Sequence, residues 1–189
     1  MTDHETPPTE TPSTGNVREP SLVLINTGDG KGKSTAAFGT AIRAVARGWK
    51  VVVIQFLKSG DWSVGEEKIG RQIGIEWWVL GDGFTWDSDD MDESQAIARV
   101  AWESAKEKIE SGRYDLVVLD EVTYPINWGW VDVTDVVSSI ESRPQKVNII
   151  LTGRDAPEEL VEIADTVTEM TKIKHAFDRG VIARRGIDY

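Results

Sequence analysis

The residues of this chain that could do chemistry begin with a run rich in glycine and lysine. The run reads Thr27-Gly28-Asp29-Gly30-Lys31-Gly32-Lys33-Ser34-Thr35 and directly follows the apolar residues 22–25. Glycines let a loop turn tightly and point several backbone N–H groups at one anion, and a following helix adds its positive N-terminal end. Lys33 can reach a phosphate oxygen, and the Ser34 hydroxyl can ligate Mg²⁺. The pattern predicts a polyphosphate-binding loop between a strand and a helix.

The loop is one residue shorter than the common phosphate-binding motif. That motif, G-x-x-x-x-G-K-[ST], would need a glycine at position 27, where this chain has Thr27. The first glycine is Gly28, so the loop reads G-x-x-x-G-K-S. A shorter loop is expected to bind the phosphates in a different way. It therefore predicts a reaction other than ordinary γ-phosphoryl transfer.

Two carboxylates, Asp120 and Glu121, follow a second apolar run at residues 117–119. Beside a phosphate-binding loop, such a strand end resembles the motif in which an acidic residue holds Mg²⁺ directly or through water. Acidic residues also end strands for purely structural reasons, so the interpretation depends on the pairing with Lys33 and Ser34. With that pairing, the pattern predicts a metal site formed by Ser34, Asp120 and Glu121, with either carboxylate as the inner ligand.

Further candidates lie in loops that follow other apolar runs. Phe84 and Trp86 alternate after Gly81 and Gly83, so both can face one side of an extended segment. They predict either an apolar wall for a large flat ligand or simple anchoring of the loop. Arg154 could contact a phosphate or a carboxylate, or could be an ordinary surface arginine.

Composition excludes several classes of function. The 189 residues carry 21 basic and 32 acidic side chains, a net charge of −11, which argues against a nucleic-acid or anionic-membrane surface. The absence of cysteine excludes disulfides and thiolate sites, and two histidines are too few for a histidine metal cluster. No apolar stretch approaches the roughly 20 residues of a membrane span. The acidic, polar N-terminus does not resemble a signal peptide, so a cytoplasmic location is expected.

Alternating apolar runs and helical patterns predict an α/β fold, with a mostly parallel sheet and helices on both faces. Valine-, isoleucine- and leucine-rich runs favour strands buried on both faces. Residues 1–20 are predicted to be a disordered tail, and residues 21–189 a single domain. The expected strands are 22–26, 50–57, 75–80, 116–120, 147–151 and 166–170. The expected helices are 34–47, 64–72, 92–111, 132–141 and 157–164. The loops with candidate residues then share the rim at the carboxyl ends of the strands.

Taken together, these segments resemble the P-loop family of ATP:corrinoid adenosyltransferases, which act on cob(I)alamin or cob(I)yrinic acid a,c-diamide. The similarity extends from about Leu22 to Tyr189. The residues that carry it are Thr27–Thr35, Ala36–Ala41, Gln55–Lys58, Gly83–Trp86, Leu119–Glu121 with Thr123-Tyr124, Thr152–Arg154, Lys174–Phe177 and Gly186–Tyr189.

The resemblance implies a P-loop NTPase-like (RecA-like) fold and a reaction. The Co(I) centre of a corrinoid would attack the 5′ carbon of ATP and release triphosphate, as in adenosylcobalamin biosynthesis or salvage. On this resemblance the loop from Thr27 to Thr35 binds the triphosphate, and Lys33 is the catalytic residue that stabilises it as it leaves. Ser34 with Asp120 and Glu121 would hold Mg²⁺, with Mn²⁺ as a second candidate ion.

The resemblance also implies partners. Phe84 and Trp86 match an aromatic pair near the corrin, where they would displace the lower axial ligand of cobalt. A reduced flavoprotein is the expected electron donor, and the family is typically homodimeric. Neither a nucleic acid nor a membrane is an expected partner.

Two other functions fit parts of the pattern. A generic P-loop ATPase or small-molecule kinase would explain the loop and the Asp-Glu pair, but not the short loop or the aromatic segment. A nucleotide-sensing binding protein without turnover would not need so many lysine, hydroxyl and carboxylate groups at this rim. The products separate the three hypotheses: triphosphate, ADP with phosphate or a phosphorylated substrate, or nothing.

Overall fold

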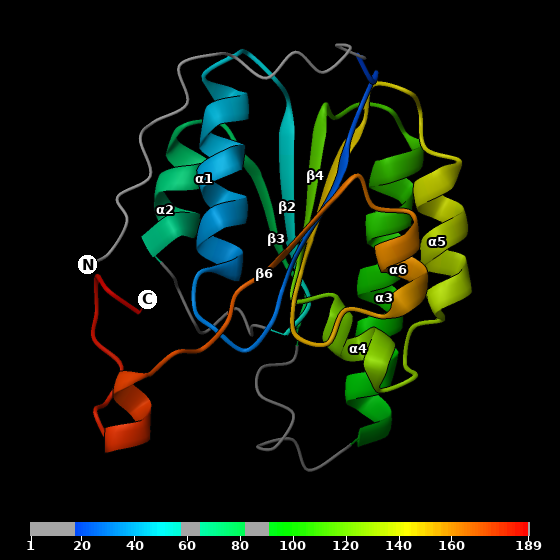
Figure 1. Cartoon of the computed structure of the whole chain (residues 1–189). Helices are drawn as coiled ribbons and strands as arrows, with labels where there is room; N and C mark the ends of the chain where they lie inside the picture. Colours follow the sequence, from blue (N-terminus) through cyan, green and yellow to red (C-terminus); the bar gives the residue numbers. More distant parts are fainter. Residues whose placement is uncertain (1–17, 58–64, 82–90, 189) are drawn as a thin grey trace, which may run out of the picture.

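The computed structural model describes residues 18–57, 65–81 and 91–188. These residues form a six-stranded sheet with the order β3-β2-β4-β5-β1-β6, and every neighbouring pair is parallel (Figure 1). The strands are β1 Val23–Thr27, β2 Val51–Gln55, β3 Glu76–Val79, β4 Leu116–Asp120, β5 Asn148–Thr152 and β6 Thr166–Glu169. Because all strands run the same way, their carboxyl ends meet at one edge of the sheet.

Helices cover both faces of the sheet, as the sequence predicts. One face carries α1 and α2, and the other carries α3, α5 and α6 (Figure 1). The helices are α1 Lys33–Val45, α2 Gly65–Gln72, α3 Met91–Glu110, α4 Thr123–Asn127, α5 Val133–Glu141 and α6 Glu158–Glu162, with a 3₁₀ turn η2 at Ala176–Arg179. Within the part of the chain that the structure describes, no helix is long and apolar enough to span a membrane.

The central strands divide their side chains between two cores. In β2, Val51 and Val53 pack beneath α1, whereas Val52 and Ile54 pack against the opposite helical layer. In β4 the same alternation separates Leu116 and Val118 from Val117 and Leu119. An uninterrupted apolar run is therefore the signature of a strand with helices on both faces.

The two edge strands depart from the prediction of burial on both faces. All four residues of β6 are exposed, and in β3 only Trp77 is buried. Each edge strand has a hydrogen-bonded neighbour on one side only, and helical cover thins toward the edges. Polar side chains such as Thr166 and Thr168 suit that position.

All six expected strands and all five expected helices are present, with ends shifted by at most two residues. Helix α4 was not predicted. It has five residues and contains Pro125, so it offers neither helical periodicity nor a favourable composition. Pro125 lies in the first helical turn, where the missing N–H removes no intrahelical hydrogen bond.

A polar cluster joins β3 to the chain that enters β4. The Tyr114 hydroxyl donates a 2.7 Å hydrogen bond to the Glu76 carboxylate, which also accepts from the Trp78 indole at 2.7 Å. Burial first, and then the hydrogen bond and charge of Glu76, raise the pKa of Tyr114 to about 12. The folded protein therefore favours the neutral phenol more strongly than the unfolded chain does.

This cluster generates a prediction for stability against pH. The contribution of Tyr114 to the free energy of unfolding is complete below its unfolded pKa of 10.0 and is lost as the pH rises through about 12. Tyr114→Phe should lower stability by about 1 kcal/mol near neutral pH. The difference from the wild type should shrink between those two pKa values in urea unfolding series. A difference that stays constant across this pH range would contradict the assignment.

Candidate functional site

The phosphate-loop segment connects β1 to α1 at the carboxyl edge of the sheet. Gly32 is the N-cap residue of α1, with φ at 113°, and no side chain caps this helix end. The N–H groups of the first turn are thus not used by a capping side chain, which is the arrangement that binds anions at a helix N-terminus. The Asn26 amide donates to the Lys33 carbonyl at 3.1 Å and ties β1 to the start of α1.

The glycines of the loop allow a close approach by the chain that follows β6. The Gly30 N–H donates a 2.6 Å hydrogen bond to the Met170 carbonyl. A Cβ atom at Gly28 or Gly30 would lie 2.6 Å from that carbonyl oxygen, so any other residue would force the two segments apart. The loop is therefore glycine-rich for two reasons, the tight turn and this contact.

The Lys33 ammonium lies over the loop, where it donates to the carbonyls of Gly28 and Gly30 at 2.6 and 2.8 Å. Burial, and secondarily the charge of Arg154, lower the pKa of Lys33, and the charges of Asp29 and Glu121 oppose this shift. These three side chains are therefore close enough to Lys33 to affect its charge. The cation predicted to contact phosphate lies at the centre of a charged cluster.

Arg154 joins this cluster from the loop after β5. Its guanidinium lies 3.6 Å from the Asp29 carboxylate, and both side chains are at least half exposed. The Arg154 carbonyl is held by the Thr123 hydroxyl at 2.6 Å, and Thr27 accepts from the Ala156 N–H at 3.2 Å. Hydrogen bonds to both flanking segments therefore place Arg154 beside the phosphate loop.

Asp120 is fully buried and belongs to a polar network that crosses four strands. Its carboxylate oxygens accept from the Gln55 amide and the Thr152 hydroxyl, each at 2.8 Å. Gln55 in turn accepts from the Trp77 indole at 2.9 Å, and Thr152 accepts from the Glu121 N–H at 2.9 Å. The network links β3, β2, β4 and β5 at their carboxyl ends and supplies a donor to each oxygen of the buried carboxylate.

Glu121 has a left-handed backbone with φ at 64°, one of two positive-φ non-glycine residues in the described chain. Such a conformation is unfavourable for a residue with a side chain and tends to occur at functional sites. Glu121 is partly exposed and contributes to the electrostatics of Lys33, whereas Asp120 is enclosed by its donors. The two carboxylates therefore have different surroundings, although sequence alone treated them alike.

A hard cation could be held at this edge by oxygen ligands. Among the described residues, no three His, Cys, Asp or Glu side chains gather into a metal-binding group. In nucleotide sites Mg²⁺ uses one or two protein oxygens and completes its shell with phosphate and water. The Ser34 hydroxyl and the Asp120 and Glu121 carboxylates are oxygen donors of the kind that such an ion takes.

The structure brings together the phosphate loop, Arg154 and the Asp120–Glu121 pair. Phe84 and Trp86 lie outside the described residues. Sequence reasoning missed the roles of Gln55 and Thr152, although each stands as a polar residue at the end of an apolar run. Met170 offered no signal, because its contribution is a backbone carbonyl.

The chain is similar to known proteins over most of its length. The sequence profile of a family described as ATP:corrinoid adenosyltransferase BtuR/CobO/CobP matches residues 19–189. A corrinoid adenosyltransferase of Escherichia coli (strain K12) is 43% identical over 171 residues, which cover 90% of this chain and 87% of that protein. The corrinoid adenosyltransferase CobA of Salmonella typhimurium is 41% identical with the same coverage.

A solved structure of EssC (ATPases 2 and 3) from Geobacillus thermodenitrificans superposes with a TM-score of 0.47 and 13% identity, covering 90% of this chain and 36% of that one. The family assignment depends on the profile match and the sequence relatives alone. The profile spans nearly the whole chain, and the phosphate loop and the strand-end carboxylates lie within it. The chain belongs to the ATP:corrinoid adenosyltransferase family.

Proposed function

We propose that this protein transfers the 5′-deoxyadenosyl group of ATP to the Co(I) centre of a corrinoid. The observation that supports this proposal is the cluster of Lys33 and Arg154 at the phosphate loop, beside the Asp120–Glu121 strand end. The cluster occurs in a member of this family. Cobalt donates an electron pair to C5′ and becomes an alkylated Co(III). The C5′–O bond breaks, and its electron pair leaves on triphosphate.

In this proposal the loop from Thr27 to Thr35 binds the triphosphate, and residues 21–189 act as one domain. Lys33 exchanges its carbonyl partners for phosphate oxygens and stabilises the charge that develops as triphosphate leaves. Arg154 adds positive charge from the loop that follows β5. A general base is unnecessary, because the attacking cobalt carries no proton to remove.

We assign Mg²⁺, with Mn²⁺ as the alternative ion, to Ser34 and the strand-end carboxylates. When bound, the ion supplies additional positive charge to the triphosphate oxygens. Glu121 is proposed as the carboxylate nearer the ion, because it is partly exposed whereas Asp120 is buried. Asp120 then acts as a positioning residue, since both its oxygens already accept hydrogen bonds.

Partners follow from the chemistry. Phe84 and Trp86 are proposed to contact the corrin and displace its lower axial ligand. Reduction of Co(II) to Co(I) requires an electron, which we assign to a reduced flavoprotein. Association into a homodimer is supported by exposed apolar side chains near the C-terminus, namely Ile173, Phe177, Ile182 and Ile187, which are 75–89% exposed. A cytoplasmic location stays a prediction from sequence.

The reaction can be tested by anaerobic incubation with ATP, Mg²⁺ and chemically reduced cob(I)alamin. Visible spectra should show a light-sensitive adenosyl-corrinoid, with one triphosphate released per turnover. Formation of ADP and phosphate with an unchanged corrinoid would instead identify an ATPase. ADP formed with a phosphorylated acceptor would identify a kinase.

Lys33→Met tests the role of the ammonium. The turnover number should fall by about 10²–10³-fold, the usual effect of removing one preorganised charge or donor from a transition state. Lys50→Met is the matched control, because Lys50 precedes β2 at the opposite edge of the sheet. If the two variants kept equal activity, Lys33 would have no catalytic role.

Trp86→Ala tests the aromatic segment. Adenosylation that starts from Co(II) with a coupled reductant should slow at least tenfold, because the corrinoid loses a wall that favours the four-coordinate state. ATP affinity, measured by equilibrium dialysis, should change less than about twofold. Loss of ATP binding in a folded variant would refute the assignment of this segment to the corrinoid.

A further inference from the structure

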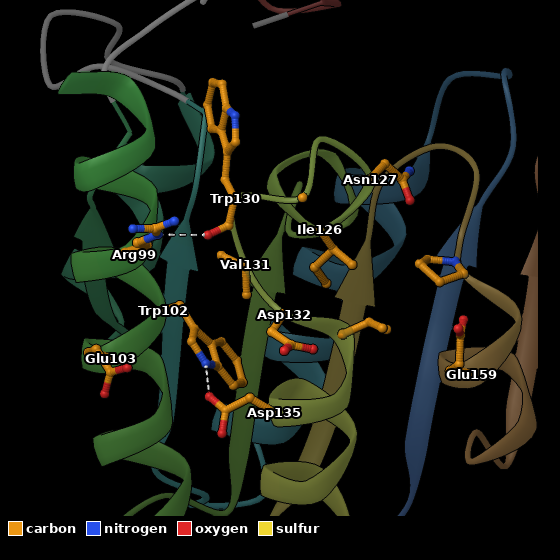
Figure 2. Close-up of a pocket in the computed structure, with 13 residues that line it drawn as sticks. Arg99, Trp102, Glu103, Ile126, Asn127, Trp130, Val131, Asp132, Asp135 and Glu159 are labelled. Atoms are coloured by element: carbon orange, nitrogen blue, oxygen red, sulfur yellow. Dashed lines mark hydrogen bonds between the residues drawn. The ribbon is translucent and has the colours of Figure 1, made fainter. Parts of the chain in front are cut away.

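A groove of about 730 Å³ lies beside the phosphate site, on the face of the sheet that carries α3, α5 and α6. Figure 2 shows α3 on one side of it, α6 on the other, and the turn between α4 and α5 across its middle. None of the residues predicted from sequence to bind ATP or metal lines this groove. It is therefore a separate surface that borders the site.

The groove is connected to the phosphate site by hydrogen bonds. Asn127, on its wall, donates to the carbonyls of Arg154 and Asp155 at 3.4 and 2.9 Å. The Arg154 guanidinium in turn lies 3.6 Å from Asp29 of the phosphate loop. The groove therefore adjoins the segment that places Arg154 beside the phosphate loop.

Three aromatic side chains at this end of the groove are linked by ring contacts. The rings of Tyr124 and Trp128 are 5.8 Å apart, and those of Trp128 and Trp130 are 4.7 Å apart. Tyr124 lies within the electrostatic influence of Arg154 and Glu121. Trp130 lines the groove, and its carbonyl accepts from Arg99 at 3.3 Å (Figure 2). Partly exposed aromatic side chains of this kind suit a flat macrocycle or its apolar rim.

The charge of the groove is predominantly negative. Its lining includes Glu103, Asp132, Asp135 and Glu159, against the single cation Arg99. Asp135 is held by the Lys106 ammonium at 2.5 Å and the Trp102 indole at 2.6 Å, and Asp132 caps α5 through Thr134. Glu103 and Glu159 remain at opposite sides of the groove, on α3 and α6 (Figure 2).

We propose that this groove receives peripheral side chains of the corrinoid and selects corrinoids whose peripheral groups are neutral carboxamides over those that carry free carboxylates. The inference rests on the proposed function, because it needs the corrinoid to approach ATP at the phosphate loop. Carboxamide N–H groups donate to the Glu103 and Glu159 carboxylates. Free carboxylates would meet like charges at the same positions, which lowers affinity and discriminates between the two substrates.

The test compares two corrinoids under identical conditions. One has all its peripheral groups amidated, and the other is an a,c-diamide whose remaining peripheral groups are carboxylates. Wild-type protein should show the higher kcat/KM with the amidated corrinoid. In the double variant Glu103→Gln with Glu159→Gln, kcat/KM for the carboxylate-rich corrinoid should rise about fivefold, and that for the amidated one should fall. Added salt should reduce this change in preference.

The control removes the same charge from the same two helices outside the groove, with Glu107→Gln and Glu162→Gln. This pair should leave the ratio of the two kcat/KM values within about twofold of the wild-type ratio. An equal shift in both double variants would overturn the proposal, because it would reflect the net charge of the protein. A wild-type preference for the carboxylate-rich corrinoid would overturn it as well.

A second variant tests the groove without changing its charge. Trp130→Ala should raise KM for both corrinoids at least fivefold, while KM for ATP changes little. An unchanged KM for the corrinoids would show that the groove is not part of the binding surface. The proposed function is judged separately by triphosphate release. Wild-type protein that releases none with either corrinoid would refute that function and this inference together, whereas normal release with an unaltered ratio would refute the inference alone.

Discussion

The buried carboxylate of Asp120 is the constraint on which the rest of the site depends. An ionised carboxylate without partners in the interior costs several kcal/mol, roughly 3–5 when one partner of a pair is removed. Gln55 of β2 and Thr152 of β5 donate to it from either side, and Trp77 of β3 secures Gln55. The hydrogen bonds exist only when these strands keep their register. The interaction that stabilises the charge therefore also aligns the strand ends that carry the site.

Glu121 shows how the hydrogen bonds of Asp120 affect the position of a neighbouring candidate site residue. Its N–H donates to the same Thr152 hydroxyl that serves Asp120, and its backbone adopts a left-handed conformation immediately after the strand. The network thus holds the chain at the point where it turns out of the sheet. A carboxylate that follows a rigidly held neighbour is positioned by that neighbour, so Asp120 can influence the site without contacting substrate.

The edge strand β6 has a similar indirect role. Its four residues are exposed and contribute little to either core, yet the chain that leaves it places the Met170 carbonyl against Gly30. One loop N–H is therefore already engaged by protein. The exposed ion pair between Lys31 and Asp188 adds a second connection between the loop and the C-terminal segment. The conformation of the short phosphate loop therefore depends on contacts with the C-terminal segment as well as on its own glycines.

Sequence predicted the features that depend on local pattern. The apolar runs identified all six strands, and the spacing of Gly28, Lys33 and Ser34 predicted a loop between a strand and a helix, which the structure places between β1 and α1. Features that depend on tertiary contacts were not predicted. Gln55 and Thr152 become partners of Asp120 only when β2, β4 and β5 lie side by side, and Met170 acts through its backbone. The exposure of β6 was also missed, although its polar residues Thr166 and Thr168 are of the kind that suits an edge strand.

The distribution of charge explains how a chain with a net charge of −11 can hold an anionic substrate. Lys33 and Arg154 concentrate positive charge at the phosphate loop, whereas the adjoining groove presents Glu103 and Glu159. A triphosphate displaced toward the groove would be repelled there and attracted back to the loop. In the proposed reaction, this contrast would place the phosphates of ATP over Lys33 and its 5′ carbon toward the groove. In that proposal, the separation of the positive loop from the negative groove helps to orient ATP before the reaction.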